Sequence, residues 1–340
     1  MSKESRIEII KKLQTARKDT FVICYITGTR QGLSYSMADD AVRLIYEHVK
    51  GLKKNKKKID LFLYSAGGAG TVPWRLVNLL REFSNNVEVL VPYKAYSAAT
   101  LTALGANKII MHPMGELGPV DPKVQNEYNP TDQRGNPIGI NVEDVASYIA
   151  LIKEGVGIRH EDELVQAFDI LAQKVHPLAL GNVHRFYSQS RLIGKKLLKL
   201  HMSREDEHKI NEIVDNLTSK LFYHGHPINR KEAKELNLKI EEPMEEVANL
   251  MWELYKEYET ELKLLEPFRP VDLLNESGQE TLRLEDLKGV YIETLNRTDV
   301  FASSFEIARP PLQPNATPQM IAQARGQVTV TLLRQGWKTE

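Results

Sequence analysis

Cysteine is nearly absent from this sequence of 340 residues, because Cys24 is the only one. One thiol excludes an internal disulfide, and its place in the apolar run Phe21–Ile26 favours buried packing over a catalytic role. No apolar stretch approaches the roughly 18 residues that a membrane-spanning helix needs, and the first residues lack the apolar core of a signal peptide. We therefore expect a cytoplasmic protein without an integral membrane segment.

An excess of charge of one sign is also missing, since Lys plus Arg and Asp plus Glu number 45 each. The chain as a whole therefore has no long-range attraction for nucleic acid or acidic lipid. The lysine-rich segment 53–58 contains neither arginine nor interleaved aromatic residues, which favours a solvated loop. We expect no nucleic-acid partner.

The first two hundred residues alternate short apolar runs with amphipathic stretches, which predicts an α/β fold with a largely parallel sheet. The expected strands are Thr20–Ile26, Ile59–Tyr64, Val87–Pro92 and Lys108–His112. Apolar residues recur at three- and four-residue steps after the first and second strands, at 41–52 and 72–83, and this spacing predicts helices there.

The rest of the chain divides into two parts. A helical region follows the polar loop at 125–139, with apolar stripes at 164–175, 183–197 and 210–221. A further stripe at 244–262 has near-heptad spacing, and is either an ordinary amphipathic face or a seam between subunits. Two β-type runs, Gly289–Leu295 and Gln327–Leu333, lie among proline-rich turns near the end. We therefore predict a domain over residues 1–265 and a small C-terminal appendage with some β-structure over 266–340.

Consecutive glycines follow the second expected strand, in the segment Ser65-Ala-Gly67-Gly68. Backbone N–H groups at such a turn can bind an anion. A phosphate loop is excluded by the spacing of the glycines and by the absence of a following Gly-Lys-Ser or Gly-Lys-Thr. The turn is either an anion-binding element or a tight structural bend.

Ser97 begins a run of small residues directly after the third strand, in Tyr93-Lys-Ala-Tyr-Ser97-Ala98-Ala-Thr100. A serine at a strand-to-helix junction lies near the positive end of the helix dipole, and small neighbours let a carbonyl group approach. Two interpretations remain open at this point. Ser97 is either a nucleophile or an N-cap residue of a closely packed helix.

A third segment, Gly115-Glu-Leu-Gly-Pro-Val-Asp-Pro122, follows the fourth strand. With the two segments above, in this order and spacing, it resembles the serine dehydrogenase proteinase family of the Clp/crotonase superfamily, to which Clp protease and signal peptide peptidase A are more distantly related. Two later stretches, 174–185 and 223–238, agree with the resemblance. It spans roughly residues 20–240 and implies a fold of repeated ββα or βαβ units.

The resemblance also implies a function, a serine peptidase independent of ATP and of cofactors that acts on peptides or proteins and forms a homo-oligomer. Ser97 would attack the peptide carbonyl group. Backbone N–H groups of Gly67 or Gly68, together with that of Ala98, would stabilise the oxyanion.

The general base is the open part of this expectation. Clp protease has a histidine about 25 residues after its serine, whereas this chain has Gly118-Pro-Val-Asp-Pro122 there. Signal peptide peptidase A uses a lysine further on, and Lys153 is its nearest counterpart, among apolar neighbours that could lower its pKa. The alternatives are His112 or His176, oriented by Asp121 or Asp169.

Two other functions fit the same pattern: a crotonase-like acyl-CoA enzyme, and a scaffold that keeps the fold without a base. His224 and His226 are too few to form a zinc site and have no supporting Cys or Glu at suitable spacing, so we expect no metal. A turn with exposed or hydrogen-bonded histidines is the simpler interpretation of that segment.

Overall fold

The computed structural model describes residues 3–18, 20–55, 57–120, 123–124, 126–132, 135–220, 226–310 and 326–340. Its centre is an eight-stranded sheet in the order β11-β7-β5-β4-β1-β12-β13-β14. The first five strands in this order are parallel: β11 (Ile240–Glu241), β7 (Lys108–Met111), β5 (Val87–Val91), β4 (Ile59–Tyr64) and β1 (Phe21–Thr27). The last three are antiparallel: β12 (Thr281–Thr294), β13 (Arg297–Ala308) and β14 (Thr329–Thr339).

The four strands expected in the first part of the chain form within one residue of their predicted ends, and the α/β class is confirmed. The large sheet with its parallel half fits a Clp-like fold. The expected repetition of ββα or βαβ units stays a prediction.

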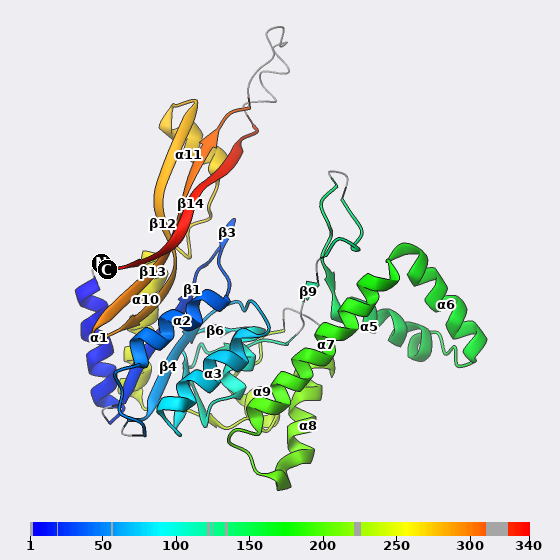
Figure 1. Cartoon of the computed structure of the whole chain (residues 1–340), viewed down its shortest axis with the longest axis horizontal. Helices are drawn as coiled ribbons and strands as arrows, with labels where there is room; N and C mark the ends of the chain where they lie inside the picture. The colour runs from blue at the N-terminus through cyan, green and yellow to red at the C-terminus, as the bar shows by residue number, and fades with distance from the viewer. Residues whose placement is uncertain are drawn as a thin grey trace.

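Helices cover both faces of the sheet, which explains why its parallel strands are mostly apolar and do not alternate between apolar and polar residues. One face carries α1 (Lys3–Ala16) and α10 (Glu245–Glu261). The other face carries α2 (Asp39–Val49), α3 (Val72–Phe83) and α4 (Ala98–Leu104), and α7 (Pro177–Leu198) and α8 (Glu207–Asp215) pack beside them (Figure 1). Cys24 is fully buried in the first of these layers, where desolvation raises its pKa, as expected of a packing residue.

The near-heptad stripe at 244–262 forms the inner face of α10. Val247, Met251, Leu254 and Tyr258 are buried against α1 and the sheet within one chain. An ordinary amphipathic face is therefore the correct interpretation, and these side chains are not available as a seam between subunits.

The C-terminal residues extend the main sheet, because β12 pairs with β1. Sequence patterning missed β13, whose buried residues include Thr298, Asp299 and Ser303. Helix α11 (Pro270–Ser277) packs beside the outer part of β12 and β13. The two ends of the chain lie side by side (Figure 1), and the Lys3 Nζ atom donates to the Glu340 backbone oxygen at 2.7 Å. The predicted division near residue 265 stays a prediction.

An arm projects from the sheet on the side opposite α1 (Figure 1). It consists of β9 (Lys123–Val124), β10 (Ile140–Asn141), α5 (Val142–Ala150), the π-helix η1 (Leu151–Gly155), α6 (Glu161–Lys174) and the first turns of α7. The stripe at 164–175 forms α6 as predicted, but none of its residues is buried. Val165 and Phe168 are 59% and 48% exposed, so part of this apolar face has no cover within the described chain.

The short elements η2 (Arg204–Asp206) and η3 (Asn216–Lys220) precede and follow α8. In the parts of the chain that the structure describes, no helix combines the length and the apolar character needed to span a bilayer.

Candidate active site

A second, small sheet forms beyond the carboxyl ends of β4, β5 and β7. Ser65 bridges to Ala95 in β6 (Lys94–Ala95), and β6 pairs in parallel with β8 (Glu116–Leu117). Leu117 then pairs in the antiparallel sense with Ile228. Ser97 leaves this small sheet two residues after Ala95 and is the residue before α4.

The backbone of Ser97 has φ 52° and ψ −112°, in a region that residues with a side chain rarely adopt. A serine held on a sharp, strained turn between a strand and a helix is the arrangement that exposes a nucleophile in many hydrolases. Ser97 occupies the N-cap position of α4, but its side chain makes no capping hydrogen bond to the helix. Its hydroxyl has no hydrogen-bond partner among the described residues.

Gly67 lies directly against this serine. A Cβ atom added to Gly67 would lie 2.8 Å from the Ser97 Cβ atom and 3.3 Å from the Ala98 nitrogen, and Gly67 itself has φ 111°. Only glycine allows both this backbone conformation and this approach. The structure therefore brings Gly67, Ser97 and Ala98 together, as the sequence motifs predicted.

The next residue, Gly68, is clamped by Met37. The Met37 N–H donates to the Gly67 oxygen at 2.8 Å, and the Ala69 N–H donates to the Met37 oxygen at 2.9 Å. A Cβ atom at Gly68 would overlap the Met37 backbone. The glycine turn is thus held by a neighbouring segment as well as by its own sequence.

The backbone donors at the site differ in availability. The Gly67 N–H donates to the Ser65 hydroxyl at 3.0 Å, so it is already in use. The N–H groups of Gly68 and Ala98 have no partner in the described parts of the chain, and Ala98 as the first helical residue has none within its helix. Gly68 and Ala98 therefore offer free donors beside Ser97.

Thr100 links the loop after β8 to the turn that contains Ser97 through hydrogen bonds. Its buried hydroxyl donates to the Ala95 oxygen at 2.7 Å and accepts from the Gly118 N–H at 3.1 Å. Tyr96 donates to Glu116 Oε2 at 2.5 Å, and burial raises the pKa of that phenol. The Gly-Glu-Leu-Gly motif thus borders Ser97, as its place after the fourth strand implied.

Comparison with known proteins agrees with this geometry. Residues 3–132, which include Gly67, Gly68, Ser97 and Ala98, match the model of the ClpP-like SDH-type serine proteinases. Residues 3–132 are therefore similar to this family. We call residues 3–132 the SDH-type region. It contains the segment following β4, the turn at Ser97 and the loop after β8.

Two relatives extend the likeness beyond the SDH-type region. An uncharacterized protein of Methanocaldococcus jannaschii is 25% identical over 280 residues, which are 81% of this chain and 86% of the relative. A second uncharacterized protein of that organism is 26% identical over 197 residues, 58% of this chain and 56% of the relative. The first of these alignments is too long to be confined to the SDH-type region.

The structure does not bring the expected bases to Ser97. Lys153 is exposed in η1, on the arm. His176 caps α7, where its Nδ1 atom accepts from the Leu178 N–H at 3.2 Å, and Asp169 is exposed on α6. Asp121 and His224 lie outside the described residues.

His112 is a packing residue on the α10 side of the sheet. Its ring stacks on Trp252 with 5.0 Å between centroids, and its Nδ1 atom accepts from the Met114 N–H at 3.0 Å. Burial, and then the charge of Arg230, lower the pKa of His112. Burial therefore favours the neutral imidazole, whose Nδ1 atom is already used as an acceptor.

One titratable pair near Ser97 was not singled out from the sequence. The Nε2 atom of His226 lies 2.7 Å from Glu232 Oε1, at the start of α9 (Arg230–Glu235). His226 precedes Ile228 by two residues on an antiparallel strand, so it lies at the same end of the small sheet as Ser97. The signal in the sequence is that His226 and Glu232 each lie three residues from Asn229, the N-cap residue of α9.

The described residues contain no group of three or more His, Cys, Asp or Glu side chains that could hold a metal ion. The hydrogen bond of His226 agrees with the interpretation of its segment as a turn with a bonded histidine.

Proposed function

We propose that the protein is a serine peptidase that cleaves peptides or proteins through an acyl-enzyme on Ser97, without a cofactor. The backbone conformation of Ser97 is the observation that carries this proposal. Such a conformation costs on the order of 1–3 kcal/mol, and the side chain does not recover that cost by capping the helix. The match of residues 3–132 to a serine proteinase family supports the same function.

In the proposed reaction the Ser97 oxygen attacks the peptide carbonyl carbon while a base takes the hydroxyl proton. The tetrahedral intermediate then collapses, and the C–N bond breaks as the base returns the proton to the leaving amine. Water attacks the resulting ester by the same route, which releases the acid and restores the Ser97 hydroxyl. No oxidant, reductant or metal enters the balance.

The oxyanion of the intermediate would accept hydrogen bonds from the N–H groups of Gly68 and Ala98. Both donors are free among the described residues, and both adjoin Ser97 or the glycine turn against it. Gly67 would contribute by its shape, because its own N–H is bonded to Ser65. Removing one donor of this kind typically lowers the rate by a factor of about 10²–10³.

Two groups are proposed as the base, and they imply different assemblies. His226, oriented by Glu232, would act within one chain. Lys153 would have to come from the arm of a second copy, since its own arm projects away from the sheet (Figure 1). The uncovered apolar face of α6 supports a homo-oligomer in either case.

Labelling with a fluorophosphonate tests the proposal, because this probe phosphonylates an activated serine. We expect the wild-type protein to be labelled and Ser97→Ala to be unlabelled. Ser188→Ala is the matched control, because Ser188 is exposed on α7. Labelling that persists in Ser97→Ala would refute Ser97 as the nucleophile.

Labelling together with a measurement of acyl-CoA binding separates the two alternative functions. A crotonase-like acyl-CoA enzyme does not require a reactive serine, so it would bind an acyl-CoA without Ser97-dependent labelling. A scaffold would show neither acyl-CoA binding nor labelling.

A further inference from the structure

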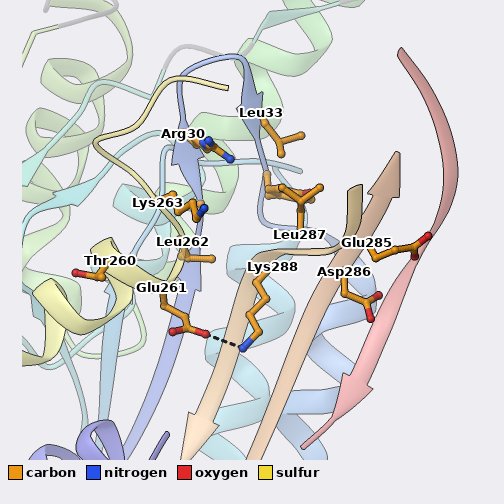
Figure 2. A pocket seen from close by; sticks show the side chains of 12 residues that line it. Arg30, Leu33, Thr260, Glu261, Leu262, Lys263, Glu285, Asp286, Leu287 and Lys288 are labelled. Carbon is orange, nitrogen blue, oxygen red and sulfur yellow. Dashed lines mark hydrogen bonds and ion pairs between the residues drawn. The ribbon is translucent and has the colours of Figure 1, made fainter. Parts of the chain in front are cut away.

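A polar cleft of about 410 Å³ lies at the carboxyl end of β1. It is bordered by the turn of β2 (Thr29–Arg30) and β3 (Leu33–Ser34), by the end of α10 and by the bulged part of β12. Figure 2 shows its lining side chains. Three acidic and three basic residues line it. The charge that it presents to a ligand therefore depends on which of these residues already form ion pairs within the protein.

All three acidic residues of the cleft have basic partners. Glu261 accepts from Lys288 Nζ at 2.6 Å, and although burial alone would raise its pKa, this contact leaves the pKa lowered. Glu285 and Asp286 accept from Arg334 at 3.1 and 3.2 Å. Figure 2 shows both of these side chains directed toward the neighbouring strands and away from Arg30. The negative charges of the cleft are therefore neutralised within the protein.

Two of the basic residues lack such neutralisation. Arg30 is only 9% exposed, yet its Nε atom donates to a backbone oxygen, that of Glu266, at 2.6 Å. No carboxylate pairs with its guanidinium group among the described residues. Among the described parts of the chain, the one ion-pair partner of Lys263 is Glu266, at 4.0 Å. Arg30 and Lys263 both line the cleft (Figure 2).

The cleft is connected to the glycine turn by a short segment. The Tyr35 N–H donates to the oxygen of Gly28 at 2.8 Å, and both residues line the cleft. Two residues later, Met37 holds Gly67 and Ala69 through its backbone. Along the main sheet, β1 is next to β4 and β4 is next to β5, which leads to Ser97.

We propose that this cleft binds a carboxylate of the peptide substrate, with Arg30 as its main partner and Lys263 as the second. This inference rests on the proposed peptidase function, because it assigns the substrate class of that site. A guanidinium group presents a planar pair of donors that fits a carboxylate. The burial of Arg30 strengthens the attraction, because nearby water is reduced.

Four peptides of otherwise identical sequence test the inference and separate the two sources of a carboxylate. Two differ in having a C-terminal acid or amide, and two differ in having an internal Glu or Gln. We expect the wild-type enzyme to have about a tenfold lower KM for one acid than for its neutral counterpart, which corresponds to about 1.4 kcal/mol. Equal KM values within both pairs would overturn the proposal.

Variants then locate the effect. Lys263→Gln should reduce the preference for the acid by about threefold. Lys256→Gln, at an exposed position on α10, is the control and should leave the preference unchanged. Arg30→Leu should abolish the preference, and Arg30→Lys should retain part of it. Unfolding curves identify any variant that fails to fold. A preference unchanged in folded Arg30→Leu would overturn the assignment of this residue.

The failure of the peptidase proposal can be distinguished from the failure of the cleft. Fluorophosphonate labelling of Ser97 reports the failure of the peptidase proposal, and the control Lys256→Gln should leave this labelling unchanged. Fluorescence anisotropy of the same four peptides on Ser97→Ala reports binding without catalysis. If labelling is absent but Ser97→Ala prefers an acid peptide through Arg30, the cleft assignment stands alone.

Discussion

Gly67 lies so close to Ser97 that a Cβ atom added to the glycine would be only 2.8 Å from the Ser97 Cβ atom. This relationship ties two motifs that are thirty residues apart in the sequence. It also means that the nucleophile turn and the glycine turn cannot be altered independently.

We predict that Gly67→Ala lowers the rate of Ser97 labelling by about 100-fold, because a displacement of the reacting group of about 1 Å has an effect of that size. The added methyl group would push on Ser97 at a backbone conformation that alanine disfavours. The control is Gly70→Ala, where an added Cβ atom meets nothing within 4 Å. Equal labelling of the two variants would contradict the argument.

Ser97→Gly should be more stable than Ser97→Ala by about 1 kcal/mol, because glycine adopts a positive φ without the cost that alanine carries. Urea unfolding of the two variants measures this difference. Both are expected to be inactive, so the comparison isolates backbone strain from chemistry. A difference near zero would show that the turn stores no strain.

The two proposed bases predict different outcomes. If His226 is the base, His226→Gln lowers the labelling rate by about 10²-fold or more, Glu232→Gln lowers it less, and the exposed control His184→Gln has no effect. If Lys153 of a second copy is the base, Lys153→Ala is unlabelled, and peptide cleavage returns when it is mixed with Ser97→Ala. Loss of labelling in His224→Gln alone would place the base at the neighbouring histidine.

A buried ion pair joins α1 to β12. Arg6 Nε lies 2.8 Å from Glu293 Oε2, and Tyr258 and Thr298 donate to the same carboxylate at 2.6 and 2.8 Å. We predict that Arg6→Met destabilises the protein by about 3–5 kcal/mol, because it leaves a buried charge without a cation. Lys12→Met, on the exposed side of the same helix, should change the free energy of unfolding little. Urea unfolding measures both.

His201 should make the protein less stable in mild acid. Burial lowers its pKa to about 4, and its Nε2 atom lies 2.8 Å from the Leu104 oxygen. Because the folded pKa is below the unfolded value of about 6.5, the unfolded state takes up the proton first, and stability is lost as the pH falls from about 6.5 toward 4.

Unfolding curves of His201→Gln should depend less on pH over that range than those of the wild-type protein. His208→Gln, at an exposed position on α8, should retain the wild-type dependence. The imidazole proton shifts of His201 give an independent titration. A midpoint near 6.5 in the folded protein would contradict the prediction.

Local pattern was sufficient for the parallel half of the sheet. The run Phe21–Ile26 is apolar throughout, because helices cover both faces of the sheet, and such runs are visible without any knowledge of the fold. The positions of Gly67, Gly68 and Ser97 after strand ends were visible for the same reason. The polar strand β13 was not, because its buried Thr298 and Asp299 are satisfied by partners that only the fold supplies.

The sequence by itself determined the class of fold and the segments that meet at the candidate site, because those depend on local periodicity and on the conformational limits of glycine. Only the tertiary structure decided the strained φ of Ser97, the exposure of Lys153, the pairing of His226 and the burial of Arg30. Each of these depends on which distant residues become neighbours. The order of strands and the packing of helices set those neighbours, and residue spacing does not reveal them.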